Sequence, residues 1–199
     1  MEILDTYDEY MNFIKAEEID TVHSLGLWHK TVHCWLYDDN GKIYFQIRKS
    51  SQKLYTTASG HVKAGETIKQ AFAREVQEEL GVNINLEDAE LIEINAWRMD
   101  KIKNGKPFID RAFAHVYLSK IATNTDFHIG LDEVSGVVEI NAQDCLNLLM
   151  QKTTSIPAFK ITDVRVPVSI TLEDFLTQDG ELAILKYGKI IFSVINKLK

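Results

Sequence analysis

The clearest structural pattern in this chain lies in residues 60–82, GHVKAGETIKQAFAREVQEELGV. Apolar side chains recur in this stretch at every fourth position: Ile68, Phe72, Val76 and Leu80. Residues spaced in this way share one face of an α-helix, because each residue turns the helix by about 100°. The pattern predicts a helix from about Thr67 to Leu80, which Gly81 ends as a C-terminal cap.

Three carboxylates lie on this predicted helix. Glu75, Glu78 and Glu79 fall within about 100° of one another around the helix axis, and Glu79 overlaps the apolar stripe. Like charges three and four residues apart destabilise a helix, and a half-buried carboxylate costs free energy unless it is paired. Arg74 carries one positive charge, for which Glu66 competes. These features predict a Mg²⁺ or Mn²⁺ site with oxygen ligands, and a solvated acidic face is the alternative on the helix pattern alone.

The spacing of a few residues before and within this helix is a stronger indication of function than the helix pattern itself. Gly60 is followed after five residues by Glu66 and, after seven more, by the run REVQEELGV at residues 74–82. This arrangement resembles, at every fixed position, the signature of the Nudix hydrolases. The resemblance implies an α/β fold, a Nudix-like α/β/α sandwich around a mixed β-sheet. It also implies cleavage of a nucleoside diphosphate linked to another group, or of a related diphosphate.

The same resemblance implies roles for individual residues. Glu66 and Arg74 match the pair that braces the loop before the helix. The implied ligands of the divalent ion, Mg²⁺ or Mn²⁺, are Glu78, Glu79 and the backbone carbonyl of Gly60. The third acid, Glu75, is implied to be a further ligand or to orient water. A divalent ion at this place would neutralise diphosphate charge, polarise phosphorus and lower the pKa of an attacking water.

Two further candidates lie outside the signature, within the roughly 152 residues that the resemblance covers. Arg48 lies on the preceding strand, near where the family often keeps a base that contacts phosphate. Glu133, in the run LDEVSGVVEI, matches a position that supplies a metal ligand or general base in several relatives. The structural alternatives are a solvated arginine and a glutamate that caps a helix or forms a salt bridge.

A second resemblance concerns the histidines. The runs GLWHKTVHCW and SGHVKAGE look like the type 1 isopentenyl-diphosphate isomerases. Three histidines match, approximately, positions that bind a metal there: His23, His29 and His61. They form a candidate second metal site, because neutral imidazoles are good ligands for a divalent ion; the alternative is that they are ordinary structural histidines. His33 is expected to pack or to form a hydrogen bond.

This sequence differs from the isomerases at two positions that their reaction needs. Ser59 stands where the isomerases need a cysteine, and a hydroxyl is a much weaker acid than a thiol. The isomerases also need two glutamates on a later strand, and the best alignment places Asp110 and Ala112 there. The sequence therefore favours a hydrolase; isomerisation and non-catalytic ligand sensing are the alternatives. The substrate stays open between nucleotides and prenyl or other small organic diphosphates.

Further strands are predicted on both sides of the helix, followed by two more helices. Alternation and turn residues predict the strands 28–37, 42–49, 91–102, 108–118 and 136–140, with hairpin turns at Asn40-Gly41 and Asn104-Gly105. Helices are predicted from Asn141 onwards and over 181–198. Residues 153–171 show no clear period and are predicted to be a connector. We expect a Nudix domain over 1–152 and a C-terminal extension, 153–199, that packs on the domain or on a second subunit of a homodimer.

Composition limits the partners and the compartment. The 199 residues carry 22 basic and 29 acidic side chains, a net charge of −7. This balance argues against binding to duplex nucleic acid or to an anionic membrane. Two cysteines form no disulfide pattern, no signal core is visible at the N-terminus, and the longest apolar stretch is too short for a membrane span. We expect a soluble cytoplasmic protein that binds a small diphosphate.

Overall fold

The computed structural model describes residues 2–84, 86–103, 105–177 and 182–199. Within these ranges the strands are β1 Ile3–Tyr7, β2 Phe13–Glu18, β3 Trp28–Tyr37, β4 Lys42–Arg48, β5 Leu54–Tyr55, β6 Ala58–His61, β7 Glu90–Lys103, β8 Lys106–Lys120, β9 Val134–Asn141, β10 Ile156–Ile161 and β11 Arg165–Ile170. The helices are α1 Ile19–Leu25, α2 Ile68–Leu80, α3 Ala142–Leu149 and α4 Ala183–Lys197, with short 3-10 turns η1 Leu86–Asp88 and η2 Leu172–Asp174.

The strands form one mixed sheet in which β3 is the central element. Its main path runs β11-β10-β9-β4-β3-β1-β2, and β8 lies parallel to β3 with β7 antiparallel beyond it. β6 also pairs with β3, so that Val32 lies opposite Gly60. One strand therefore brings the loop before α2 and the long β7–β8 hairpin to the same region of the molecule.

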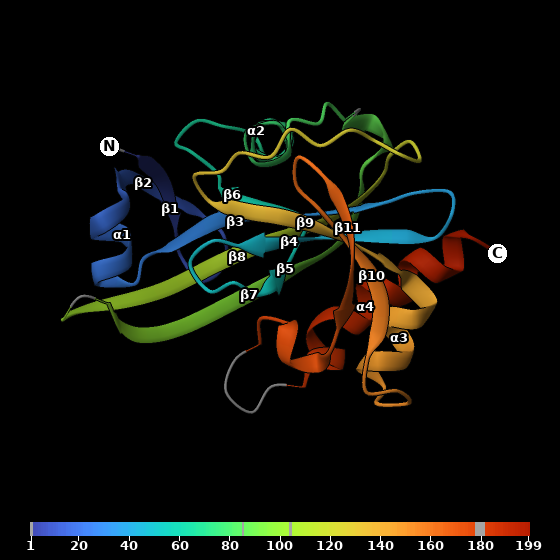
Figure 1. Ribbon diagram of the computed structural model, residues 1–199. Helices are drawn as coiled ribbons and strands as arrows, with labels where there is room; N and C mark the ends of the chain where they lie inside the picture. The colour runs from blue at the N-terminus through green and yellow to red at the C-terminus, as the bar shows by residue number, and fades with distance from the viewer. Residues whose placement is uncertain (1, 85, 104, 178–181) are drawn as a thin grey trace.

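Helices cover both faces of the sheet. Figure 1 shows α2 on one side of the strands and α3 with α4 on the other. One buried apolar cluster joins α2 to the sheet through Phe72, Val76 and Leu80, and a second joins α3 and α4 to it. The predicted α/β/α sandwich around a mixed sheet, with an additional C-terminal helix, is confirmed.

The signature helix begins and ends at the predicted residues. The Thr67 hydroxyl accepts the backbone N–H of Gln70, whose side chain accepts the N–H of Thr67, a reciprocal pair of N-terminal capping bonds. At the other end Gly81 has φ 65°, a left-handed conformation that glycine adopts without steric cost. Both boundaries are local properties of the sequence.

The predicted connector over 153–171 is wrong. Residues in this range form β10 and β11, an antiparallel hairpin that pairs with β9 and extends the sheet. Pro167 lies on β11, which is the edge strand, where a missing N–H breaks no bond of an interior ladder. No element was predicted before residue 28, where β1, β2 and α1 form.

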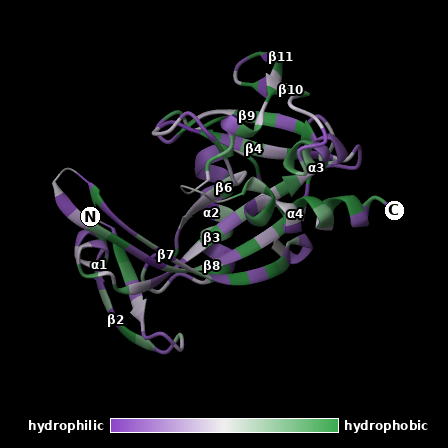
Figure 2. Ribbon diagram, turned by 90° about the horizontal axis from the view of Figure 1, so that it is seen from below, coloured by the Kyte–Doolittle hydropathy of each residue, from purple (hydrophilic) through white to green (hydrophobic). Residues whose placement is uncertain are grey.

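The C-terminal helix lies in the same core as the sheet. Tyr187, Ile191 and Val194 are buried against residues of α3 and of the sheet, and Figure 2 shows that much of α4 is hydrophobic. Glu181, where the helix was predicted to begin, and Asn104 of the predicted turn lie outside the described residues. No helix in the described ranges is long and apolar enough to span a membrane.

We expect Ile191→Ala to lower the free energy of unfolding by about 3 kcal/mol, because it empties a site that is fully enclosed. The melting temperature should fall by roughly 10 °C in a chain of this size. Leu185→Ala on the same helix is the control, since Leu185 is 75% exposed. Equal melting temperatures of the two variants in thermal unfolding would contradict the placement of α4.

Candidate active site

The loop between β6 and α2 holds the carboxylates close to the backbone. Gly60 lies on β6, and a Cβ built on it would come within 2.1 Å of the carboxyl group of Glu75. Any larger residue at position 60 must therefore displace this carboxylate. Glycine is required here for the close approach of a side chain rather than for an unusual φ.

Arg74 connects the acidic residues of the signature. Its guanidinium forms a fork with Glu66, with N–O distances of 2.9 Å for both Nε and Nη2. Nη1 donates to Glu75 at 2.6 Å and to Glu78 at 3.1 Å, and Nη2 also donates to the backbone carbonyl of His61 at 2.8 Å. One cation thus orients three carboxylates and ties them to the end of β6.

Glu79 is the most deeply buried of the signature acids, at 6% exposure. Its Oε2 accepts hydrogen bonds from the Ser59 backbone N–H at 2.9 Å and from Gln46 Nε2 at 3.1 Å. Burial raises the pKa of Glu79 to about 8, although the Ser59 bond acts in the opposite direction; the charges of Glu75 and Glu133 add to the increase. Burial likewise raises the pKa of Glu75.

The donor set fits a hard divalent cation. Glu66, Glu75, Glu78 and Glu79 together offer four carboxylates, and Arg74 supplies one positive charge in contact with three of them. Burial is the main cause of the raised pKa values of Glu75 and Glu79, and a cation bound by these carboxylates would stabilise their ionised forms. Carboxylate oxygens in such a cluster are the ligands that Mg²⁺ and Mn²⁺ prefer.

Arg48 and Glu133 line the same cavity as Gly60. This cavity has a volume of about 520 Å³ and also includes Ser59 and His61. Arg48 lies over the ring of Tyr55, 5.0 Å from its centroid, and forms no ion pair with the described part of the chain. The structure therefore places both candidates from outside the signature beside it, where their roles remain predictions.

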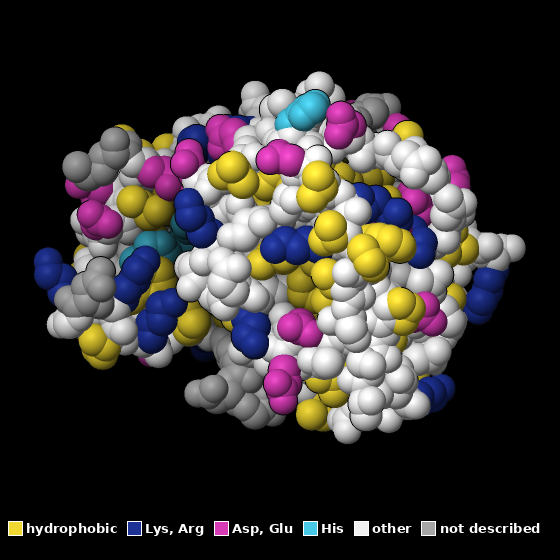
Figure 3. All heavy atoms as spheres, in the orientation of Figure 1, with side chains coloured by type: hydrophobic (Ala, Val, Ile, Leu, Met, Phe, Trp, Pro, Cys, Tyr) yellow, Lys and Arg dark blue, Asp and Glu magenta, His cyan; other side chains and the backbone are white. Residues whose placement is uncertain are grey.

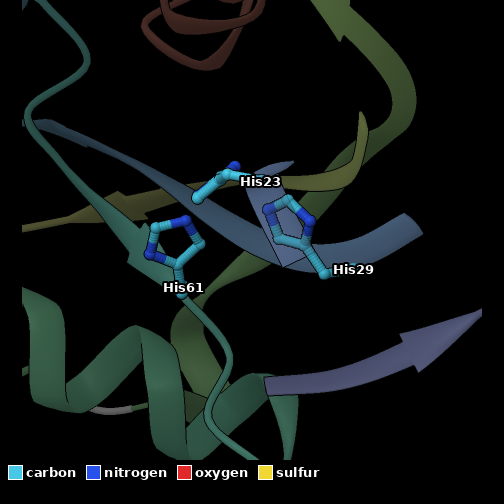
Figure 4. A group of neighbouring side chains, drawn as sticks. All are labelled: His23, His29 and His61. Carbon is cyan, nitrogen blue, oxygen red and sulfur yellow. The ribbon is translucent and has the colours of Figure 1, made fainter. Parts of the chain in front are cut away.

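The three histidines of the second resemblance meet at one point. His23 comes from α1, His29 from β3 and His61 from β6, and one ring nitrogen of each lies within 4.8 Å of the others. Figure 4 shows the three imidazoles grouped around a common centre. His23 and His29 are buried, and His61 is partly buried. The structure thus brings together residues up to 38 positions apart in the sequence.

The chemistry of this imidazole cluster (His23, His29 and His61) suits a metal. Burial lowers the pKa of all three, that of His61 to about 3, so the rings are neutral at pH 7. His23 Nδ1, His29 Nε2 and Asp110 Oδ1 are buried without a hydrogen-bond partner among the described residues. Asp110 Oδ1 lies 3.6 Å from His29 Nε2. Buried polar atoms without partners are uncommon, and coordination would satisfy them.

Sequence reasoning did not place Asp110 beside the histidines. The register of β3 and β8 sets His29 opposite Ala112, which brings Asp110 into reach at the end of the pair. His33 does not join the cluster; its Nε2 lies 3.5 Å from the Tyr55 hydroxyl, in agreement with the expected hydrogen bond. Position 112, which matches the second glutamate of the isomerases, is a buried alanine and offers no carboxylate.

Basic side chains surround the entrance of the cavity of about 520 Å³ that Gly60 lines. Figure 3 shows Lys and Arg side chains beside a recessed histidine, over α1 and the β7–β8 hairpin. The basic lining residues are Arg48, Lys101 and Lys103. The acidic lining residues are Glu2, Asp20, Asp110 and Glu133. A cavity lined by both kinds of charge can hold a cation and a polyanion together.

Comparison with known proteins identifies the family. The model of the NUDIX domain matches residues 27–155. An uncharacterized Nudix hydrolase of Clostridium acetobutylicum is 36% identical over 160 residues, which are 76% of this chain and 75% of that protein. An isopentenyl-diphosphate Delta-isomerase of Serratia proteamaculans is 29% identical over 122 residues, which are 59% of this chain and 65% of that protein.

Solved structures share the fold. A crystal structure of a Deinococcus radiodurans protein covers 75% of this chain and 89% of its own, with a TM-score of 0.55 and 18% identity. A MutT/nudix family protein from Enterococcus faecalis covers 84% of this chain and 61% of its own, with a TM-score of 0.51 and 19% identity. At these identities the likeness concerns the fold alone.

Proposed function

The chain belongs to the Nudix family, and we propose that it is a Mg²⁺- or Mn²⁺-dependent pyrophosphohydrolase that cleaves a diphosphate linkage in a small molecule. The observation that supports this most strongly is the complete set of signature carboxylates, three of which contact Arg74, next to Gly60, which lines a cavity. A protein that only senses a ligand would not need this group of partly buried charges, whose burial costs free energy of folding.

Each residue of the site has a defined task in this proposal. Glu75, Glu78 and Glu79, with the carbonyl of Gly60, hold the ion, and Glu66 with Arg74 holds the loop in place. When bound, the ion offsets diphosphate charge and makes water a better nucleophile. Arg48 binds a phosphate oxygen of the substrate. Glu133 faces the cavity, where it removes a proton from the attacking water or adds a ligand.

The test is a panel of nucleotide sugars, dinucleotides and prenyl diphosphates, each incubated with Mg²⁺ and with Mn²⁺. Release of a monophosphate product from at least one compound, and its loss with excess chelator, is the expected result. Absence of hydrolysis across the panel with either ion, for protein that melts cooperatively, would count against the proposal.

Isomerisation of isopentenyl diphosphate is the second candidate, and the imidazole cluster with Asp110 is the observation that favours it. The reaction needs one group to protonate a carbon and another to remove a proton. Ser59 and Ala112 supply neither group at the two matching positions. With Mg²⁺, isopentenyl diphosphate should therefore yield no dimethylallyl diphosphate in ³¹P NMR and chromatography. Rapid interconversion with the diphosphate intact would replace the hydrolase proposal by this one.

The imidazole cluster is proposed as a second metal site, distinct from the carboxylates. We expect the metal-stripped protein, after loading with Mn²⁺ and desalting, to retain one more ion than the variant His29→Asn. The asparagine keeps a polar group of similar shape but removes the imidazole ligand. His128→Asn, whose side chain is 76% exposed, is the control and should retain the wild-type metal content. Identical metal-to-protein ratios for wild type and His29→Asn would reject the second site.

A further inference from the structure

The strand β4 carries a buried amide on the face of the sheet that α2 covers. Side chains along a strand alternate between the two faces, so Gln46 shares a face with Tyr44. Tyr44 packs in the apolar cluster beneath α2, and Gln46 is only 1% exposed. Burying an amide costs free energy unless the amide is hydrogen-bonded. The partner of Gln46 therefore indicates what this residue does.

That partner is the deepest carboxylate of the signature. Gln46 Nε2 donates to Glu79 Oε2 at 3.1 Å, and the Ser59 backbone N–H donates to the same oxygen at 2.9 Å. In the described part of the chain, Glu79 forms no ion pair and its other oxygen, Oε1, accepts no hydrogen bond. Oε1 is thus the oxygen that stays available to hold an ion.

Two donors on one oxygen restrict the orientation of the carboxylate. The terminal torsion of a glutamate is broad, so a single hydrogen bond leaves the plane of the carboxylate free to turn. Here the donors come from two different strands, Gln46 from β4 and Ser59 from β6. An ionised carboxylate can only accept, so Gln46 must present its NH₂ group whenever Glu79 is charged.

We propose that Gln46 is a positioning residue of the metal site, whose amide turns Glu79 so that Oε1 meets the ion. The inference rests on the proposed hydrolase function, which places the ion at Glu79, and adds a residue from outside the signature. Gln46 acts through Glu79 and contacts neither the ion nor the substrate. Hydrogen-bond partners of metal ligands typically account for about ten- to a hundredfold of metal affinity.

The geometric demands of two ions distinguish positioning from a purely structural role. Mg²⁺ requires nearly ideal octahedral geometry, whereas Ca²⁺ accepts irregular arrangements of oxygen ligands. A misdirected Oε1 should therefore weaken the binding of Mg²⁺ more than that of Ca²⁺. General damage to the fold, or loss of a charge, would weaken the binding of both ions.

Calorimetric titration of the metal-free protein with Mg²⁺ and with Ca²⁺ tests the inference. Both ions prefer oxygen ligands, so the carboxylates rather than the imidazole cluster bind them. Gln46→Met keeps the length of the side chain and removes the donor. This variant should bind Mg²⁺ about tenfold more weakly than wild type. Its affinity for Ca²⁺ should fall by less than about threefold.

Cys34→Ala is the matched control for altered packing. Cys34 is buried on β3, which pairs with β4, and belongs to the same apolar cluster as Tyr44. The substitution changes packing beneath α2 and removes no hydrogen bond to Glu79. The ratio of the Mg²⁺ and Ca²⁺ dissociation constants should equal that of wild type. Melting temperatures of the metal-free variants show whether each is folded.

Excess Mg²⁺ provides a second measurement, in hydrolysis. Gln46→Met retains every ligand, so it should need about tenfold more Mg²⁺ for half-maximal turnover. At saturating Mg²⁺ its kcat should return to within about threefold of wild type. Glu79→Gln lacks the charged ligand itself and should not recover in the same way.

An unchanged Mg²⁺ affinity in Gln46→Met, equal losses for both ions, the same loss in Cys34→Ala, or no binding of Mg²⁺ by wild type would overturn the inference. Ion binding is measured without substrate, which separates this result from the proposed function. If Mg²⁺ binding depends on Gln46 but no diphosphate is hydrolysed, the hydrolase proposal fails and the positioning role stands. If hydrolysis occurs and Gln46→Met binds Mg²⁺ as wild type does, only the positioning role fails.

Discussion

Replacing Glu79 by glutamine is expected to reduce divalent-ion-dependent hydrolysis by roughly a thousandfold or more. The amide keeps the size of the side chain and can still accept the Ser59 N–H, so the shape of the site is preserved. What it loses is the negative charge of the most deeply buried carboxylate of the site. The measurement is kcat at saturating substrate and Mg²⁺.

Stability separates this effect from damage to the fold. Without metal, the melting temperature of Glu79→Gln should stay level or rise, because repulsion with Glu75 and Glu133 decreases. Glu87→Gln is the control, since Glu87 is exposed, pairs with Lys69 and lies outside the site. Full turnover by Glu79→Gln would remove the metal role from this residue.

Gly60→Ala should produce the second large effect, a loss of at least about a hundredfold in kcat together with weaker metal binding. The added methyl group would come within 2.1 Å of the Glu75 carboxyl group, so the carboxylate must leave its present position and its bond with Arg74 is disturbed. Titration with Mn²⁺ and steady-state kinetics measure the two consequences.

Gly105→Ala provides the comparison for this prediction. An added Cβ meets nothing within 4 Å there, although its φ of 75° imposes some strain. We expect a small loss of stability in Gly105→Ala and unchanged turnover. Wild-type metal affinity in Gly60→Ala would show that Glu75 does not need its observed position.

Local signals explain which parts of the fold were predictable. The bounds of α2 follow from the Thr67 cap, the apolar stripe and Gly81, all within one short stretch. β3 and β4 follow in the same way from alternation around an Asn-Gly turn. The β10–β11 hairpin was missed because its two prolines suggested breaks in the pattern. Pro167 is tolerated because β11 is the edge strand, and Pro157 precedes the residues of β10 that pair with β9.

The residues of the candidate site also differ in whether local sequence patterns could predict them. The carboxylates of α2 are neighbours on one helix, so their spacing revealed them. Asp110 approaches His29 only through the parallel register of β3 and β8. Contacts of this kind depend on tertiary structure, which periodicity in a single sequence does not encode.

The hydrogen bond from Arg74 to the backbone carbonyl of His61 has a consequence for cooperativity. This bond links Arg74, which contacts three of the carboxylates, to β6, the strand that carries His61 of the imidazole cluster. Ions at the two places would therefore bind with linked affinities. By thermodynamic reciprocity, the factor by which the first ion changes the dissociation constant of the second equals the factor in the opposite order of loading.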